Sequence, residues 1–520
     1  MSIPPTPAPP LQETPSEKRF AKNVLWNWAG VVVSLFTGFV LSPLIIRHAG
    51  ADGYGIWALS FALVDYYWFL DFGFRSATVK YVAHYAATGE AERIGEVLST
   101  SLVYAGGFAA VIVLVVGTFL PRIVGFFQVA PAYRFTFTVL LSLITLSWCT
   151  GAVLGLFQIS LEAVQRFDIT NRIAVGTTAV RAIAQAALLF GGFGLIPLGA
   201  ATIGSQVLGY VLNFVWFRKL FGRVRISPRL ASRAMLKQLG GFGIHSFFVT
   251  ISTQLQNQSA PILIGHFLPA AFTGFYNLPM RLVQYTAEFV GRIAVVTNAS
   301  AAALAAKEQA AALKQLGIYA NRYSLVIFLP MAILLGVQGE QFLVLWVGPA
   351  VAHYSAQVLP ILLAGYVIAV VGQLSSGMLL IGMGRHQGYA RGMVTETVLG
   401  FVLLPLVIPR WGIVGAAWVG ALLMIANRGC YLAFLTSQAL RLVIWEYAAQ
   451  VYVRPLLSAI PAAAISVALK RSVLPGTSWV QIALAAAVAG LSYYPVALFF
   501  AIDGEHRRAV FSAVRRRLAG

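Results

Sequence analysis

The sequence predicts an all-α integral membrane protein with about 14 transmembrane helices. Of its 520 residues, 59% are hydrophobic and only 10% are charged, whereas a soluble globular protein carries roughly 25% charged residues. Backbone groups cannot stay unpaired in lipid, so only helices or a closed β-barrel can span a bilayer. Apolar runs such as VVVSLFTGFVLSPLII (31–46) lack the alternation of a barrel strand, and they therefore indicate helices.

Apolar segments long enough to span a bilayer recur along the chain. A hydrocarbon core of roughly 30 Å needs about 20 apolar residues per helix. The expected spans are 22–47, 55–86, 98–120, 135–161, 170–190, 195–217, 239–266, 271–299, 316–338, 355–381, 390–408, 412–435, 451–469 and 480–502.

Polar segments divide these spans into regions. The first residues are Pro-rich and acidic and lack the apolar core of a signal peptide, so they predict a disordered tail. In chain order the regions are a disordered cytoplasmic tail (1–17), an N-lobe of spans 1–6 (22–217), a basic cytoplasmic linker (218–237), a C-lobe of spans 7–12 (239–435), a helical hairpin of spans 13–14 (451–502) and a basic cytoplasmic tail (503–520).

The distribution of Lys and Arg predicts the orientation, because cytoplasmic loops are enriched in basic residues. With the N-terminus inside, loops and span ends on the inner side hold 23 of the 37 basic residues, and those on the outer side hold 6. Both termini are therefore expected in the cytoplasm, and the protein in the inner (cytoplasmic) membrane. The net charge of +20 is scattered between spans, which argues against a nucleic-acid partner.

The two halves of the chain begin alike. PLIIRH (43–48) ends the first span and PILIGH (261–266) ends the seventh. An even number of spans separates the copies, so both cross in the same direction, as in parallel transporter repeats. This pattern predicts two pseudo-symmetric six-helix lobes. After a one-residue shift the match continues, with Gly55, Leu59, Leu63, Val64 and Tyr66 aligned to Gly274, Leu278, Leu282, Val283 and Tyr285.

The segment 43–85 contains GYGIW (53–57) and LDFGF (70–74), and TGEAERIGEV (88–97) follows it. These features resemble the first two helices of bacterial polysaccharide-export flippases of the O-antigen type, in the multidrug/oligosaccharidyl-lipid/polysaccharide exporter superfamily. The resemblance implies two six-helix lobes facing each other, two additional C-terminal helices, and an undecaprenyl-pyrophosphate-linked oligosaccharide as substrate.

The eighth expected span carries a polar stripe. Arg281, Gln284, Glu288 and Arg292 are spaced for one helical face. A charge at the bilayer centre costs about 2.5–3.5 kcal/mol, so such residues face a cavity or a partner. Glu288 can neutralise Arg292 within the helix. Arg281 lies near mid-depth without an acidic neighbour one turn away, and we expect it to bind the pyrophosphate. The alternative is a permanent ion pair with an acid of another helix, such as Asp65.

The second expected span carries Asp65, Asp71 and Arg75. Asp71 and Arg75 are spaced to pair within a helix, but Gly73 between them permits a kink that turns Arg75 toward a lumen. The repeat places this span opposite the eighth. We therefore expect Arg75 to assist Arg281 in a water-filled cavity between the lobes, while Asp65, Asp71 and Glu288 are candidates for ion coupling.

Polar residues also interrupt the seventh span, in STQLQNQS (252–259). Gln254, Asn257 and Gln258 predict either hydrogen bonds between helices or a wall that faces sugars. The candidate substrate-binding set also includes Arg281, Arg75, Arg292 and Gln284. Elsewhere, four isolated charges stand near span ends or at uncertain depth, and the sequence assigns them no role: Arg181, Arg322, Glu396 and Arg428.

Three functional classes remain open at this point. The first is a flippase for lipid-linked oligosaccharide, which requires basic residues for a pyrophosphate. The second is a cation-coupled multidrug exporter, which is disfavoured by a first span without acids but is kept open by Asp65 in the second span. The third is a membrane glycan polymerase or ligase, disfavoured because no loop exceeds about 20 residues and no catalytic motif is present.

No cofactor or metal is expected, because Cys149 and Cys430 stand alone within apolar runs. The expected partners are the lipid-linked oligosaccharide and membrane lipids, with other polysaccharide-assembly membrane proteins as candidates. Two lobes that enclose their own pathway are compatible with a monomer.

Overall fold

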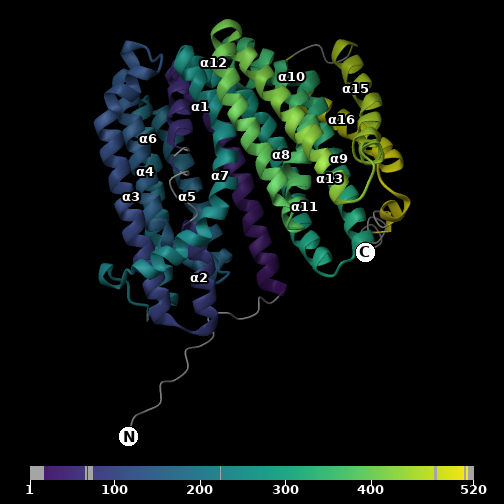
Figure 1. Ribbon diagram of the computed structural model, residues 1–520. Helices are drawn as coiled ribbons and strands as arrows, with labels where there is room; N and C mark the ends of the chain where they lie inside the picture. Colours follow the sequence, from purple (N-terminus) through teal and green to yellow (C-terminus); the bar gives the residue numbers. More distant parts are fainter. Residues whose placement is uncertain are drawn as a thin grey trace. The chain divides into compact units, whose positions relative to one another are not determined.

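The computed structural model describes the backbone of residues 17–64, 67, 74–222, 224–472, 477–508 and 511–512. Side chains at 17–25, 27–28, 242–257, 289, 292–296, 299, 373 and 386 lie outside the description. The expected tail 1–17 falls almost entirely on residues that are not described. Within the described ranges every regular element is a helix, which confirms the predicted all-α fold class (Figure 1).

The chain forms two compact units. Residues 1–258 with 269–271 make the first, and 259–268 with 272–520 make the second. The helices of the first unit are α1 (Glu17–Val64), α2 (Phe74–Thr88), α3 (Ala91–Phe126), η2 (Pro131–Tyr133), α4 (Arg134–Ala163), α5 (Phe167–Phe190), α6 (Leu195–Leu220), η3 (Pro228–Leu230) and most of α7 (Arg233–Phe267).

The second unit holds the remaining helices and includes three short π-helical segments, η4, η5 and η6. They are α8 (Ala270–Ala306), α9 (Ala310–Val347), α10 (Pro349–Val370), η4 (Val371–Ser376), α11 (Gly377–Gly382), α12 (His386–Met424), η5 (Ile425–Tyr431), α13 (Leu432–Ala439), α14 (Ile444–Ala448), η6 (Ala449–Val453), α15 (Arg454–Ser472) and α16 (Trp479–Phe500).

Ten helical segments of the described chain are long and apolar enough to cross a membrane, by length and composition. The expected number of 14 is therefore not confirmed. The expected span 55–86 corresponds to the end of α1 and to α2, and most of the residues between them are not described.

Glycine interrupts two of the long helices. Gly50 in α1 has φ 73° and Gly412 in α12 has φ 58°. Residues with a side chain rarely adopt this left-handed region. Each glycine therefore lets the chain change direction between two helical stretches. Gly50 lies between two expected spans, and Gly412 is the first residue of the expected span 412–435.

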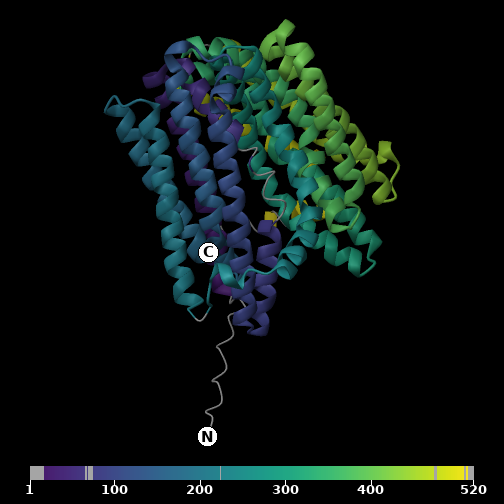
Figure 2. The same cartoon turned by 60° about the vertical axis from the view of Figure 1, so that its left-hand side comes forward.

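In the first unit, α3, α4, α5 and α6 run side by side, with α4 packed on both α3 and α6 (Figures 1 and 2). A cluster of buried apolar residues holds α2 against α3, α4 and α6, and it includes Ala77, Val97, Leu161 and Phe217. The outward faces carry exposed large side chains such as Leu114. This arrangement leaves the inward faces of α2, α3, α4 and α6 to form an interior surface.

Candidate functional site

A cavity of about 380 Å³ lies inside the first unit, among α2, α3, α4 and α6. Aromatic and polar side chains share its lining. The aromatic residues are Phe74, Tyr104, Phe108, Trp148 and Tyr210, and the polar residues are Arg75, Ser101, Ser147, Gln158 and Gln206.

Arg75 contributes a positive charge to this cavity and forms a loose ion pair. Its Nη2 lies 3.8 Å from Oε2 of Glu162, and the two side chains are 37% and 23% exposed. Gln158 Nε2 donates a hydrogen bond of 2.8 Å to Oε1 of Glu162. A partly solvated ion pair contributes only roughly 0.2–1 kcal/mol. An incoming anion can therefore replace Glu162 as the partner of Arg75 at little cost.

The aromatic wall comes from consecutive turns of α3 and the start of α2. Phe74 stacks on Tyr104 with ring centroids 3.7 Å apart and an interplanar angle of 14°. Tyr104 in turn stacks near Phe108, at 6.0 Å and 19°. Aromatic faces carry partial negative charge and accept the weakly positive C–H groups of apolar or sugar surfaces. The wall therefore suits a ring that presents C–H groups.

The opposite wall comes from α4 and α6. Ser147 Oγ donates a hydrogen bond to Oε1 of Gln206, and both side chains line the cavity. Tyr210 stands directly over Gly151, because a Cβ built on Gly151 would lie 2.5 Å from the Tyr210 hydroxyl oxygen. Glycine at this position is what allows the tyrosine hydroxyl to reach the cavity.

Among the predicted substrate-binding residues whose side chains the structure describes, Arg75 is the one that lines this cavity. Sequence reasoning missed its partner Glu162 and the amides of Gln158 and Gln206, which come from α4 and α6. Glu162 is an acid just beyond the expected span 135–161, and that location was its only signal in the sequence.

The other predicted residues lie elsewhere. On α8, Arg281 and Gln284 are half-buried and Glu288 is exposed. Gln284 forms a hydrogen bond with Tyr366 of α10. Gln258 is half-buried on α7. The remaining candidates fall on residues or side chains that are not described, and these are Asp65, Asp71, Gln254, Asn257 and Arg292. The joint site of Arg75 and Arg281 stays a prediction.

Two of the isolated charges pair with each other. Arg428 Nε lies 3.2 Å from Oε2 of Glu396, and both side chains are 2% exposed. Asn427 Nδ2 donates a second hydrogen bond of 2.6 Å to the same carboxylate. This neutral, enclosed group joins α12 to the π-helical segment η5, so it has a structural role.

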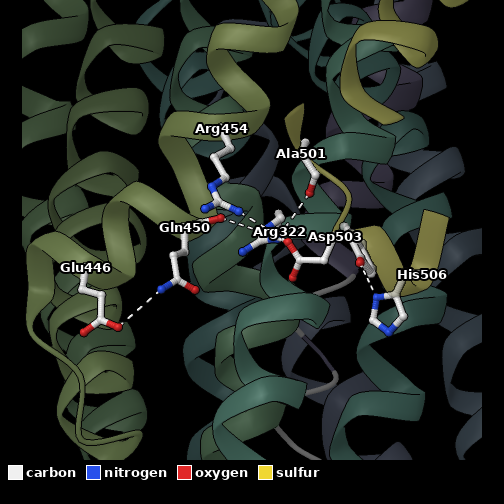
Figure 3. Close-up of polar contacts among 8 residues, drawn as sticks. Arg322, Glu446, Gln450, Arg454, Ala501, Asp503 and His506 are labelled. Carbon is white, nitrogen blue, oxygen red and sulfur yellow. Dashed lines mark hydrogen bonds and ion pairs between the residues drawn. The ribbon is translucent and has the colours of Figure 1, made fainter. Parts of the chain in front are cut away.

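Arg322 of α9 is a third isolated charge, and it lies at the centre of the polar group in Figure 3. It is 1% exposed, and its Nη1 lies 2.8 Å from Oδ1 of Asp503. Its Nε donates to the backbone oxygen of Gln450 at 2.6 Å. Arg454 also reaches Asp503, at 3.4 Å. The contacts connect α9 to η6, to α15 and to the end of α16, so this arginine holds the last two long helices against α9 within the second unit.

Comparisons with known proteins agree with this architecture. The family model described as "Polysaccharide biosynthesis protein" matches residues 20–298, more than half of the chain. The uncharacterized membrane protein EpsK of Bacillus subtilis is 21% identical over 96% of this chain and 98% of its own length. A putative O-antigen transporter of Shigella flexneri is 20% identical over 76% of this chain and 93% of its own length.

Among solved structures, the lipid II flippase MurJ in an inward closed conformation superposes with a TM-score of 0.71. The alignment covers 92% of this chain and 98% of that one, at 12% sequence identity, so it supports the fold. The family match over more than half of the sequence settles the classification: this chain is a multi-pass membrane protein that belongs to the polysaccharide biosynthesis protein family.

Proposed function

We propose that this protein is a flippase that moves an undecaprenyl-pyrophosphate-linked oligosaccharide from the cytoplasmic to the outer leaflet of the inner membrane, without making or breaking a covalent bond. The observation that carries the proposal is the cavity of the first unit, where Arg75, held by a weak ion pair with Glu162, shares the lining with an aromatic wall. Family membership supports the same cargo class.

The proposed role of Arg75 follows from its weak hold on Glu162. A guanidinium group stays charged and forms paired hydrogen bonds to phosphate oxygens. The pyrophosphate would replace Glu162 as the anion beside Arg75 when the cargo binds. The ion pair between Arg75 and Glu162 would form again when the cargo is released. Such an exchange keeps the charge of Arg75 compensated in both states, which a carrier that must release its cargo requires.

One observation favours a second candidate, a cation-coupled multidrug exporter. Glu162 pairs with Arg75, which lines the cavity together with the aromatic residues, and an organic cation binds well between a carboxylate and aromatic faces. In that function Glu162 would bind the organic cation, and its ion pair with Arg75 would open to free the carboxylate.

The experiment compares both cargoes in proteoliposomes that contain the purified protein. A fluorescent undecaprenyl-pyrophosphate-linked oligosaccharide is followed by its accessibility to a membrane-impermeant quencher, and a fluorescent organic cation is followed by uptake. We expect glycolipid movement that falls at least about tenfold in Arg75→Ala, in keeping with the strength of a charge-assisted contact. Arg75→Lys should be intermediate.

Arg93→Ala is the matched control, because Arg93 lies on α3 outside the cavity lining, where it pairs with Glu96 at 2.8 Å. It should leave glycolipid movement unchanged. Uptake of the cation that depends on Glu162, without movement of glycolipid, would replace the flippase with the exporter.

A further inference from the structure

Arg181 differs from the other isolated charges. It lies on α5, nine residues before the helix ends at Phe190, or about 14 Å along the axis at 1.5 Å per residue. Its side chain is half-buried. Arg322 and Arg428 each have a carboxylate partner, whereas none of the ion pairs among the described residues includes Arg181. A charge at this depth requires a polar environment or a ligand.

A pocket of about 200 Å³ supplies that environment, among α4, α5 and α6. Hydroxyl and amide groups dominate its lining, and no aspartate or glutamate is among the lining residues. Beside Arg181 it is lined by Thr170, Thr177, Thr178, Ser205 and Asn213.

Two of these side chains are almost fully buried and have an atom without a hydrogen-bond partner. Thr170 is 2% exposed and Asn213 is 3% exposed. Thr170 Oγ1 and Asn213 Oδ1 have no partner, although Asn213 Nδ2 donates to the backbone oxygen of Gly209 at 2.9 Å. Buried polar atoms are rarely left unsatisfied. Their presence in the lining of one pocket indicates that a polar ligand completes it.

The pocket adjoins the cavity described above. Gln158, Gln206 and Tyr210 line both, so the same three side chains form a partition between Arg75 on one side and Arg181 on the other. A pocket this small is below the size of drug-sized sites, so it suits a single ring or a small ion. A sugar in the pocket would be attached to a chain that continues into the larger cavity.

The unsatisfied groups limit the chemistry of the ligand. Arg181 requires an anionic acceptor, and Asn213 Oδ1 requires a donor. A neutral sugar supplies hydroxyl donors but leaves the guanidinium uncompensated. A carboxylate alone compensates Arg181 but offers Asn213 no donor. A sugar that carries a carboxylate satisfies both, and its remaining hydroxyls can reach Thr170.

We propose that the pocket around Arg181 binds one acidic sugar, of the uronic acid type, in the oligosaccharide that the protein moves. This inference rests on the proposed function and adds a preference for anionic glycans. Arg75 then acts on the anchor's pyrophosphate, while Arg181 recognises the glycan itself.

The direct test uses soluble probes, so that it does not depend on transport. Purified protein in lipid nanodiscs is titrated with D-glucuronate, D-glucose or inorganic phosphate, and saturation-transfer NMR reports binding. We expect glucuronate to bind at least about tenfold more tightly than glucose or phosphate, because only it offers both a carboxylate and hydroxyl donors. Glucuronate that does not bind, or that binds no better than phosphate, would overturn the proposal.

The variants locate the binding. Arg181→Gln should remove the preference for glucuronate over glucose, and Thr170→Val, which keeps the side-chain shape, should weaken glucuronate binding without affecting phosphate. Arg172→Gln is the matched control, because Arg172 is an exposed arginine of the same helix that lies over Trp26. If Arg181→Gln does not fold, an unchanged glucuronate affinity in Thr170→Val suffices to reject the site.

Transport separates this inference from the proposed function. Glycolipids with and without one uronic acid are compared in proteoliposomes. Movement of both at equal rates, together with no glucuronate binding, removes the acidic-sugar site and leaves the flippase intact. Glucuronate binding that depends on Arg181, without movement of either glycolipid, keeps the site and rejects the flippase.

Discussion

Glu396 and Arg428 form an ion pair that is almost completely enclosed, with a separation of 3.2 Å and 2% of each side chain exposed. Removal of one partner leaves an uncompensated buried charge, which costs roughly 3–5 kcal/mol. We therefore expect Glu396→Gln and Arg428→Met each to lower the melting midpoint of the purified protein. The double variant Glu396→Leu/Arg428→Met should recover most of the loss, because it removes both charges.

Lys314 and Glu446 provide the control for this pair. They lie 3.9 Å apart and are 41% and 47% exposed, and a pair so exposed contributes at most about 1 kcal/mol. Lys314→Gln should leave the melting midpoint nearly unchanged. A double variant at Glu396 and Arg428 that is no more stable than either single one would contradict the ion-pair interpretation.

Asp503 makes the stability of the second unit depend on pH in the acid range. Burial tends to raise the pKa of this carboxyl group. The charge of Arg322 and the hydrogen bonds from Arg322 and Tyr319 together lower it by more, so the pKa lies below its ordinary value of 3.8. The stabilisation is therefore fully present above pH 3.8 and is lost as the pH falls through the lower pKa of the folded state.

The corresponding measurement is the melting midpoint of wild type and Asp503→Asn across the acid range. We expect the wild type to be more stable above pH 3.8, and the difference to shrink below that value as Asp503 becomes protonated. Asp168, which pairs locally with Arg166 at 3.0 Å, supplies the control Asp168→Asn. A difference that stays constant into strong acid would show that the charge of Asp503 is not what stabilises the helices.

The position of Tyr210 depends on Gly151. Since a Cβ on Gly151 would lie 2.5 Å from the Tyr210 hydroxyl, Gly151→Ala should displace the tyrosine and reduce glycolipid movement several-fold. Tyr210→Phe in the same chain removes the clashing oxygen and should restore part of the activity. Gly204→Ala on α6 is the control, because a Cβ there meets nothing within 4 Å, and it should be neutral or slightly stabilising. Equal transport by Gly151→Ala and wild type would show that glycolipid movement does not depend on the position of Tyr210.

Composition and apolar segment length were sufficient to predict the fold class, because lipid permits few alternatives to the helix. The residues around positions 43–97 were sufficient to predict the family, and the match over 20–298 confirms it. Pairing between helices could not be predicted in the same way. Arg322 and Asp503 are 181 residues apart in the chain, and no helical periodicity relates them.

The same limit applies to the candidate site. Arg75 was identifiable because a charge within an apolar span is costly. Its observed partner, Glu162, belongs to α4, and only the packing of α2 on α4 brings the two together. The sequence offered Asp71 instead, which has the right spacing within one helix but lies outside the described residues. Arg181 received no role from sequence, because its significance depends on which other charges are paired.

Reversal of the Arg75–Glu162 pair tests whether Arg75 is a ligand or only a structural partner. Arg75→Glu alone should place two acids side by side, and we expect modest destabilisation of no more than about 1 kcal/mol, because the pair is partly solvated. The swap Arg75→Glu/Glu162→Arg restores the ion pair with the charges exchanged.

If the pair has only a structural role, the swap should recover both melting midpoint and glycolipid movement. If Arg75 binds the pyrophosphate, the swap should recover the melting midpoint, while glycolipid movement stays at least about tenfold below wild type. The reason is that the guanidinium now extends from α4 instead of α2 and no longer has the geometry for paired hydrogen bonds to phosphate. Transport by the swapped protein at the wild-type rate would remove Arg75 from cargo binding and leave it a structural role alone.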